Sequence, residues 1–119
     1  MEIKDFSTAE IAAKALEMPT EFNGKSIYIL GKVTGLPYPE VQAKFAAAEA
    51  LLIEEGYKVY NPLNYVHPAA EWKDAMRTCI GIVIYCNAVY CLPCWEDSKG
   101  ATLEHTIAEQ LGLEMIYHI

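Results

Sequence analysis

The sequence has 119 residues, of which 53% are hydrophobic and 21% charged, which is the size and composition of one globular domain and too small for two. Sixteen acidic residues against nine basic ones give a formal net charge of −7, and the resulting field disfavours polymeric nucleic acid and anionic membranes as partners. No segment approaches the roughly 18 consecutive apolar residues of a membrane span, and the first residues lack a signal-peptide pattern, so we expect a cytoplasmic protein.

The first segment, residues 1–24, is predicted to be a helical extension. Ser7 and Glu10 have the spacing of a capping box, which begins a short amphipathic helix that Pro19 ends. The remainder, residues 25–119, is predicted to form one domain.

Strands and helices alternate along this domain. Strands are expected at 25–30, 57–60, 88–92 and 114–117, and helices at 39–55, 71–86 and 101–111. The first of these strands is a nearly continuous hydrophobic run, which is typical of a strand buried on both faces. The alternation predicts an α/β fold with a parallel sheet covered by helices on both sides, reached by right-handed crossovers.

Two loops of unusual composition follow the first and third of these strands. In parallel sheets of this kind, ligands bind beyond the carboxyl ends of the strands, at the point where the strand order reverses. Residues 31–39 contain two glycines and two prolines, and residues 93–100 combine polar residues with a tryptophan. We therefore expect these two loops to be neighbours at a ligand site.

Glu104 lies in the middle of an apolar stripe on the last helix, formed by Ala101, Leu103, Ile107, Ala108 and Leu111. An unpaired buried charge costs several kcal/mol, so either a partner compensates the carboxylate or the position belongs to a cleft. Its place in the first helical turn favours the ionised form, and therefore a nucleophile or anion role over a general acid. The alternative is that this turn protrudes and Glu104 is only a capping charge.

Backbone N–H groups near both loops offer sites for an anion. Ser98 and Gly100 stand at the start of the last helix, where phosphate binds readily, although a serine there also serves as an ordinary N-cap. Gly31 and Gly35 let a ligand approach the backbone closely. Their G-x-x-x-G spacing alone is a weak signal and is not the dinucleotide-binding fingerprint.

Other side chains flank the same loops. Lys32 and Thr34 are placed to face a ligand, although isolated residues of these types are more often solvated. Trp95 either plugs the edge of the core or stacks on a flat ligand. Tyr38 flanks the first loop, whereas Tyr28 is expected to pack within the sheet.

The four cysteines lie within residues 79–94, and a reducing compartment argues against a disulfide framework. Cys91 and Cys94 have the C-x-x-C spacing, but Cys91 falls inside a predicted strand rather than at a helix start, where a thiolate is stabilised. No second close pair of ligands completes a zinc site, and the three histidines do not cluster. We expect neither a metal nor a cofactor.

Several segments together resemble the DUF4406 family of small proteins over residues 25–117; they are IYILGKVTGLP at 27–37, YNP at 60–62, Trp72 with Met76, and LPCWEDSKGATLEH at 92–105. That family is in turn similar to nucleoside 2-deoxyribosyltransferases and deoxynucleoside 5′-monophosphate N-glycosidases. The resemblance implies a small Rossmann-like (flavodoxin-like) three-layer sandwich with four or five parallel strands, to which the N-terminal helix is an addition.

The resemblance also implies roles for individual residues. In the enzymes a glutamate of an S-x-G-x-x-x-E pattern attacks C1′ of the sugar, and Ser98, Gly100 and Glu104 match that pattern. In monophosphate-specific relatives, the serine and the backbone of the first loop hold the phosphate or sugar, which implies such a role for Ser98 and for the loop residues Gly31, Lys32 and Gly35.

The chain departs from this pattern at three positions. Cys79 stands where the enzymes carry an aspartate that assists the leaving base, and a thiol does this work poorly. Asp74 is a poor substitute because it lies about 500° round the helix from Cys79. Asn87 stands where an aspartate is usual before the third strand, and Cys94 stands where the DUF4406 family usually has glycine.

Three hypotheses follow. The first is an N-glycosidase or 2-deoxyribosyltransferase acting on a nucleoside or nucleotide, with Glu104 as nucleophile and with Trp95 or Tyr38 beside the base. The second, favoured by Cys79, is a non-catalytic protein that binds a nucleotide or nucleotide-derived signal. The third is a partner-binding protein, which leaves the placement of Glu104 unexplained. For the first two we expect a homo-oligomer, because a small sheet leaves apolar surface for another subunit.

Overall fold

The computed structural model describes residues 24–118, so the expected extension at 1–24 lies almost wholly outside the described residues. Strands and helices alternate in the order β1 (Ser26–Leu30), α2 (Tyr38–Glu54), β2 (Lys58–Tyr60), η2 (Pro62–Asn64), α3 (Trp72–Val83), β3 (Ala88–Cys91), η3 (Trp95–Asp97), α4 (Lys99–Gln110) and β4 (Glu114–Tyr117).

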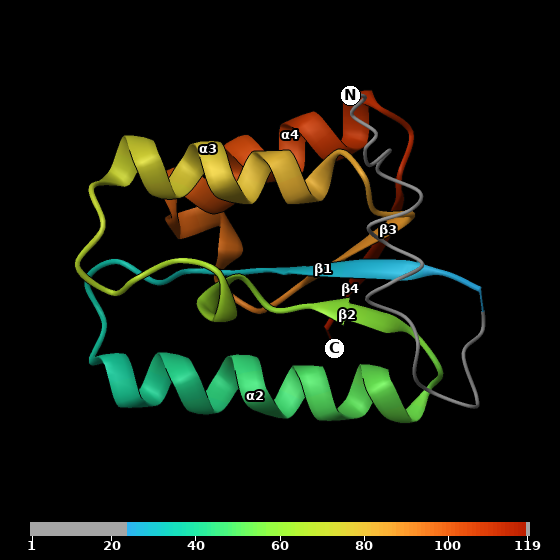
Figure 1. Ribbon diagram of the computed structural model, residues 1–119, viewed down its shortest axis with the longest axis horizontal. Coiled ribbons are helices and arrows are strands. Elements are labelled where there is room, and N and C mark those ends of the chain that lie inside the picture. The colour runs from blue at the N-terminus through green and yellow to red at the C-terminus, as the bar shows by residue number, and fades with distance from the viewer. Residues whose placement is uncertain (1–23, 119) are drawn as a thin grey trace, which may run out of the picture.

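The four strands form one parallel sheet in the order β2-β1-β3-β4. Helix α2 covers one face, and α3 and α4 cover the other, which gives three layers (Figure 1). The predicted α/β architecture of a small Rossmann-like fold is therefore confirmed, with four strands. The order reverses between β1 and β3, whose register pairs Leu30 with Cys91, so the loops after these strands leave the sheet side by side as expected.

The core has two halves because alternate residues of a strand point to opposite faces. Ile27 and Ile29 of β1 face α2 and pack in a cluster with Phe45. Tyr28 and Leu30 face the other way, toward α3 and α4. All four of these β1 residues are at most 1% exposed, which confirms a strand buried on both faces.

Helix α4 differs from its prediction in two respects. It begins at Lys99 rather than near residue 101, because the Ser98 side chain accepts the backbone N–H of Ala101 at 3.1 Å and so caps the helix. Its buried face also differs from the predicted stripe, since Leu103 is 39% and Leu111 is 56% exposed. The residues that face the sheet are Ala101, Glu104 and Ala108. Two alanines thus flank the acid, and small side chains let the helix lie close to the sheet.

No helix in the described part of the chain is long and apolar enough to cross a lipid bilayer.

Candidate functional site

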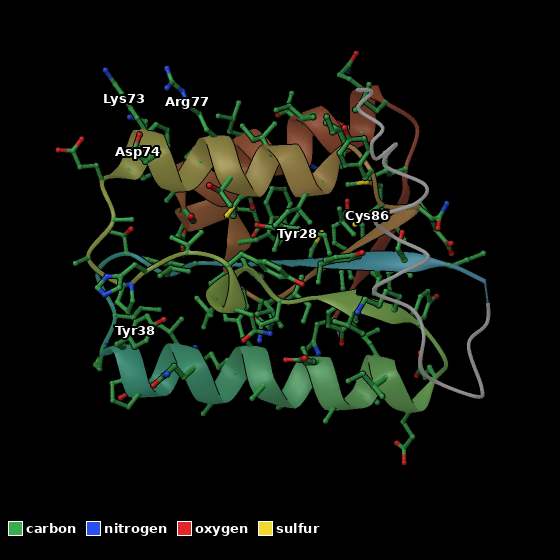
Figure 2. The ribbon with its side chains drawn as sticks, in the orientation of Figure 1. Tyr28, Tyr38, Lys73, Asp74, Arg77 and Cys86 are labelled. Carbon is green, nitrogen blue, oxygen red and sulfur yellow. The ribbon has the colours of Figure 1, made fainter. Side chains whose placement is uncertain are left out.

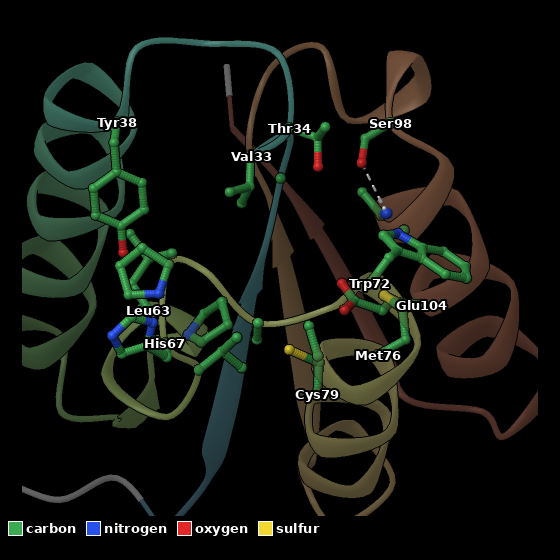
Figure 3. A pocket seen from close by; sticks show the side chains of 18 of the residues that line it. Val33, Thr34, Tyr38, Leu63, His67, Trp72, Met76, Cys79, Ser98 and Glu104 are labelled. Carbon is green, nitrogen blue, oxygen red and sulfur yellow. Dashed lines mark hydrogen bonds between the residues drawn. The ribbon is translucent and has the colours of Figure 1, made fainter.

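A pocket of about 510 Å³ opens at the carboxyl edge of the sheet, near the point where the strand order reverses (Figure 3). Its volume lies in the range of small-molecule sites. The walls come from the end of β1 and the loop after it, the segment between β2 and α3, the inner face of α3, and the start of α4. The lining residues are Tyr28, Gly31, Val33, Thr34, Leu36, Tyr38, Pro62, Leu63, Val66, His67, Pro68, Ala70, Trp72, Ala75, Met76, Cys79, Ser98, Gly100, Ala101 and Glu104.

The carboxylate of Glu104 is held at the base of this pocket. Its side chain is 5% exposed, and the hydroxyl of Tyr28 donates a hydrogen bond of 3.0 Å to Oε2. Tyr28 is 1% exposed and lies between the sheet and the helices above it (Figure 2). One carboxylate oxygen is therefore oriented by a rigid strand residue, and no hydrogen bond to Oε1 is found within the described residues.

The protonation of Glu104 differs from the expectation based on its place near a helix N-terminus. Burial raises its pKa to about 7, and the hydrogen bond from Tyr28 opposes this shift only in part. The residue lies in the second turn of α4, and the favourable field of a helix end falls off beyond the first turn. Desolvation therefore dominates, and the carboxyl group is divided between its acid and its carboxylate form at neutral pH.

Cys79 lies on α3 and lines the pocket close to Glu104 (Figure 3). Its thiol lies beside the Tyr28 hydroxyl, whose single proton is donated to Glu104. Burial raises the pKa of Cys79 to about 11, and the neighbouring Tyr28 hydroxyl opposes this shift in part. The side chain is therefore a neutral thiol at physiological pH.

The start of α4 forms the wall next to Glu104. Ser98 caps the helix by accepting the N–H of Ala101, and the N–H groups of Lys99 and Gly100, which begin the helix, have no intrahelical partner. A Cβ on Gly100 would stand 3.0 Å from Sδ of Met76, so a larger residue here would displace the Met76 side chain. Trp72 lies alongside, and the Lys99 ammonium sits 4.2 Å from the centre of its ring. This wall thus combines unpaired backbone donors with an aromatic face.

The opposite wall is formed by the segment between β2 and α3, with Leu63 and His67 facing Tyr38 (Figure 3). Asn61 fixes this segment, because its side chain donates to Glu49 of α2 at 3.0 Å and accepts the N–H of Leu63 at 3.0 Å. Nδ1 of His67 accepts the N–H of Ala69 at 2.9 Å, so Nε2 carries the proton of the neutral ring. The wall is apolar with one hydrogen-bond donor, which suits the face of a heterocyclic base.

Six of the residues singled out from the sequence line this pocket: Gly31, Thr34, Tyr38, Ser98, Gly100 and Glu104. Three others do not: Lys32, Gly35 and Trp95. Val33, from the same loop as Thr34, also lines it.

Gly31 and Gly35 are glycines for reasons of backbone and packing. A Cβ on Gly31 would stand 2.9 Å from Cδ1 of Leu92, so the glycine lets the end of β1 lie close to the residue that follows β3. Gly35 has a φ of 89°, a left-handed conformation that favours glycine. Neither observation requires a ligand.

Trp95 packs against the protein instead of facing the pocket. Its ring stacks on His105 at a centroid distance of 3.9 Å and an angle of 9°, and Nε2 of His105 is 2.7 Å from the Tyr117 hydroxyl. Of the two alternatives for Trp95, the structure therefore supports a plug at the edge of the core. The stack ties η3 to α4 and β4.

Several lining residues were not among the proposed site residues. The sequence could have pointed to Tyr28, since strand alternation places its hydroxyl on the same buried face as Leu30, where a polar group needs a partner. Trp72 and Met76 were named from the sequence only as part of the family resemblance. Nothing in the sequence points to His67 as a site residue, because a single histidine in a loop is most often solvated.

The three positions at which the chain departs from the patterns of its family and of the similar enzymes have different consequences. Asn87 is far from the pocket, at the amino end of β3, where its side chain accepts the N–H of Ser26 at 2.8 Å. Cys94 has a φ of 69°, in the left-handed region, which explains why a glycine suits this position. Only Cys79 lies in the pocket, and Asp74 is exposed and does not line it.

Among residues 24–118, no group of three or more histidine, cysteine, aspartate or glutamate side chains is arranged to hold a metal ion.

A family model described as a domain of unknown function, DUF4406, matches residues 25–117, and the chain therefore belongs to this family. No curated protein matches the chain.

Proposed function

We propose that this member of the DUF4406 family cleaves the N-glycosidic bond of a nucleoside or nucleotide, as a hydrolase or as a 2-deoxyribosyltransferase, with Glu104 as the nucleophile. The observation that carries the proposal is the buried carboxylate of Glu104, oriented by the Tyr28 hydroxyl at 3.0 Å inside a pocket large enough for a nucleoside. A carboxylate in this setting is poorly explained by stability, because its burial is costly and its described partner is a single phenol.

The geometry suits a double displacement at the sugar. The carboxylate attacks C1′ through Oε1, while Tyr28 holds Oε2. The bond from C1′ to the base nitrogen breaks, its electron pair leaves with the base, and a glycosyl ester forms on Glu104. Water resolves this ester in a hydrolase, and a second base resolves it in a transferase. The transition state resembles an oxocarbenium ion, which a nearby carboxylate stabilises.

The rest of the pocket offers places for the other parts of the substrate. The start of α4, with Ser98 and Gly100, is suited to a phosphate or to sugar hydroxyls, because its first N–H groups are unpaired in the helix. The base is then placed between Tyr38 and Leu63 on the opposite wall, with Nε2–H of His67 as a donor. Such substrates occur in the cytoplasm, which is where we place the reaction.

A second candidate is a protein that binds a nucleotide without turning it over. The specific observation in its favour is Cys79, since a thiol whose pKa is about 11 stands beside Glu104 in place of a stronger acid. A departing base then receives no proton from this position. A binding protein retains the pocket and the oriented carboxylate but releases the ligand unchanged.

We also propose that the chain works as a homo-oligomer. Large apolar side chains are exposed beyond the pocket, including Tyr85 at 59% and Leu111 at 56%. Light scattering coupled to gel filtration tests this: a dimer or larger species supports it, and a monomer at micromolar concentration contradicts it.

The test of the enzymatic proposal is an incubation with ribo- and deoxyribonucleosides and their 5′-monophosphates, followed by mass spectrometry of free base and retained ligand. Glu104→Gln keeps the shape of the side chain and removes the nucleophile, so base release falls at least about 1000-fold. Glu109→Gln, on the exposed face of the same helix, is the matched control. Base release that persists in Glu104→Gln refutes the role of Glu104, and retention without release identifies a binding protein.

A further inference from the structure

The carboxylate of Glu104 is buried without a cationic partner. Among the described residues that line the pocket, Glu104 has the one carboxylate, and none is a lysine or an arginine. Lys99 is near, but its ammonium lies over the Trp72 ring rather than in the lining. A buried anion is stabilised when an opposite charge approaches it in a low-dielectric site. A ligand that complements this pocket therefore carries a positive charge.

Besides Glu104, no lining residue carries a carboxyl group that could protonate a leaving base; the other titratable side chains of the lining are Tyr28, Tyr38, His67 and Cys79. Cys79 is a neutral thiol with a pKa raised to about 11. The ring of His67 accepts the N–H of Ala69 through Nδ1. The Tyr28 proton is engaged by Glu104, and burial raises the pKa of this phenol well above its ordinary value. A neutral purine or pyrimidine leaves as an anion unless it is protonated, so such bases are poor leaving groups here.

We infer that the preferred substrate of the proposed reaction is an N-glycoside whose base already carries a positive charge, such as a pyridinium nucleoside or a purine nucleoside alkylated at N7. This inference rests on the proposed function, and it names the substrate class for the same site. It joins the two observations above, because a cationic base both compensates the buried carboxylate and departs as a neutral molecule without a proton donor.

The step balances without any group beyond the substrate and water. Oε1 of Glu104 forms a bond to C1′, and the bond from C1′ to the ring nitrogen breaks. The electron pair of that bond moves onto the nitrogen, which neutralises the cationic ring. Water then attacks C1′, loses its proton to solvent, and frees the Glu104 carboxylate and the sugar.

Aromatic side chains in the lining fit the same ligand. Trp72 and Tyr38 line the two sides of the pocket (Figure 3). The face of an aromatic ring attracts a cation, and a flat cationic heterocycle also stacks on it. The formal net charge of −7 further favours the approach of a cation over that of a neutral nucleoside.

The test compares guanosine with 7-methylguanosine, which differ by one methyl group and one positive charge. Both are supplied as ribo- and 2′-deoxyribonucleosides and as their 5′-monophosphates, and each enzymatic rate is divided by the spontaneous rate of the same compound. We expect this ratio to be at least about tenfold larger for the methylated compound, because its positive charge pairs with the buried Glu104 carboxylate, while division by the spontaneous rate removes its intrinsic advantage as a leaving group. Nicotinamide riboside, a pyridinium nucleoside, is expected to behave as the methylated compound does.

Each result decides the inference. Equal ratios for the two guanosines overturn it and leave the proposed glycosidase intact. No base release from any compound, cationic or neutral, overturns both.

A substitution supplies the missing acid and tests the reason for the preference. Cys79→Asp places a second carboxyl group beside Glu104, where repulsion between like charges keeps one proton bound. We expect the guanosine rate to rise at least about tenfold and the preference for 7-methylguanosine to shrink. Cys79→Ser introduces no acid and preserves the preference. A folded Cys79→Asp variant with an unchanged preference contradicts the inference, and the comparison in the unsubstituted protein decides it if that variant does not fold.

Discussion

The hydroxyl of Tyr28 donates a hydrogen bond of 3.0 Å to Oε2 of Glu104, and the two residues are separated by 76 positions in the sequence. Tyr28 belongs to a central strand of the sheet, and Glu104 belongs to the last helix, which packs on that strand. The contact joins the most rigid part of the fold to the residue that we propose as the nucleophile. It also restrains the protonation of that residue, because a donor stabilises the charged carboxylate.

Tyr28→Phe removes this donor and leaves the ring in place. The hydrogen bond lowers the pKa of Glu104, so its loss moves that pKa upward from about 7. NMR titration of the side-chain carboxyl carbon of Glu104 measures this directly, without reference to activity. In the proposed reaction the nucleophile must be ionised, so kcat/KM at pH 7 falls about fivefold for the first unit of the shift and about tenfold for each further unit. The rising limb of the plot of kcat/KM against pH also moves to higher pH. Tyr60→Phe, on β2 and outside the pocket lining, is the control, and an unchanged titration in Tyr28→Phe contradicts the prediction.

The stability of the protein is expected to fall as the pH rises through the titration of Glu104. Its folded pKa of about 7 lies above its ordinary value of 4.5, so the folded state holds the proton more tightly than the unfolded state does. The loss of folding free energy that accompanies ionisation of Glu104 is absent below about pH 4.5 and complete above about pH 7, where it reaches about 3 kcal/mol.

Glu104→Gln, which does not titrate, isolates this contribution. The difference in the free energy of unfolding between the variant and the natural chain is expected to shift by about 2–3 kcal/mol in favour of the variant between pH 5 and pH 8. Urea unfolding at the two pH values measures it. A difference that does not depend on pH shows that Glu104 ionises in the folded state as it does in water.

The alternation of strands and helices allowed the fold and the place of the pocket to be predicted. Continuous apolar runs in β1 and β3 mark strands that are buried on both faces. A parallel order with one reversal then brings the two following loops together. Glu104 was found because an acid among apolar residues conflicts with simple packing. These features depend on the order and spacing of apolar and polar residues, which can be read directly from a sequence.

The errors concern properties that depend on packing. Leu103 and Leu111 were assigned to the buried stripe of α4 together with Ala108, but the rotation of a helix on a sheet is set by its neighbours, and of these three residues only Ala108 is buried. Trp95 found a ring to stack on in His105, ten residues further on, and no local pattern shows that contact. The protonation of Glu104 depends on how deeply it is buried, which helix position alone does not reveal.

The two tryptophans of the chain provide a direct test of where the ligand binds. Trp72 lines the pocket and Trp95 does not, because the Trp95 ring is stacked on His105. Titration with 7-methylguanosine is expected to quench the fluorescence of the natural chain and of Trp95→Phe by a similar amount. Trp72→Phe is expected to lose most of this quenching. The reverse assignment would place the base beside Trp95 and would refute the pocket described above.

Cys94→Gly is expected to stabilise the protein. Cys94 has φ 69° and ψ 16°, the left-handed conformation, which costs a residue with a Cβ about 1–2 kcal/mol. Glycine removes this cost but loses about 0.4–1 kcal/mol through the greater freedom of the unfolded chain. The net gain is about 0.5–1 kcal/mol, which raises the melting temperature by a few degrees. Cys94→Ala removes the thiol and keeps the Cβ, so it separates the two effects in a thermal melt monitored by circular dichroism. If the backbone at Cys94 is strained, only the glycine variant melts at a higher temperature than the natural chain. Equal melting temperatures for the two variants show that the thiol, and not the backbone, sets the stability at this position.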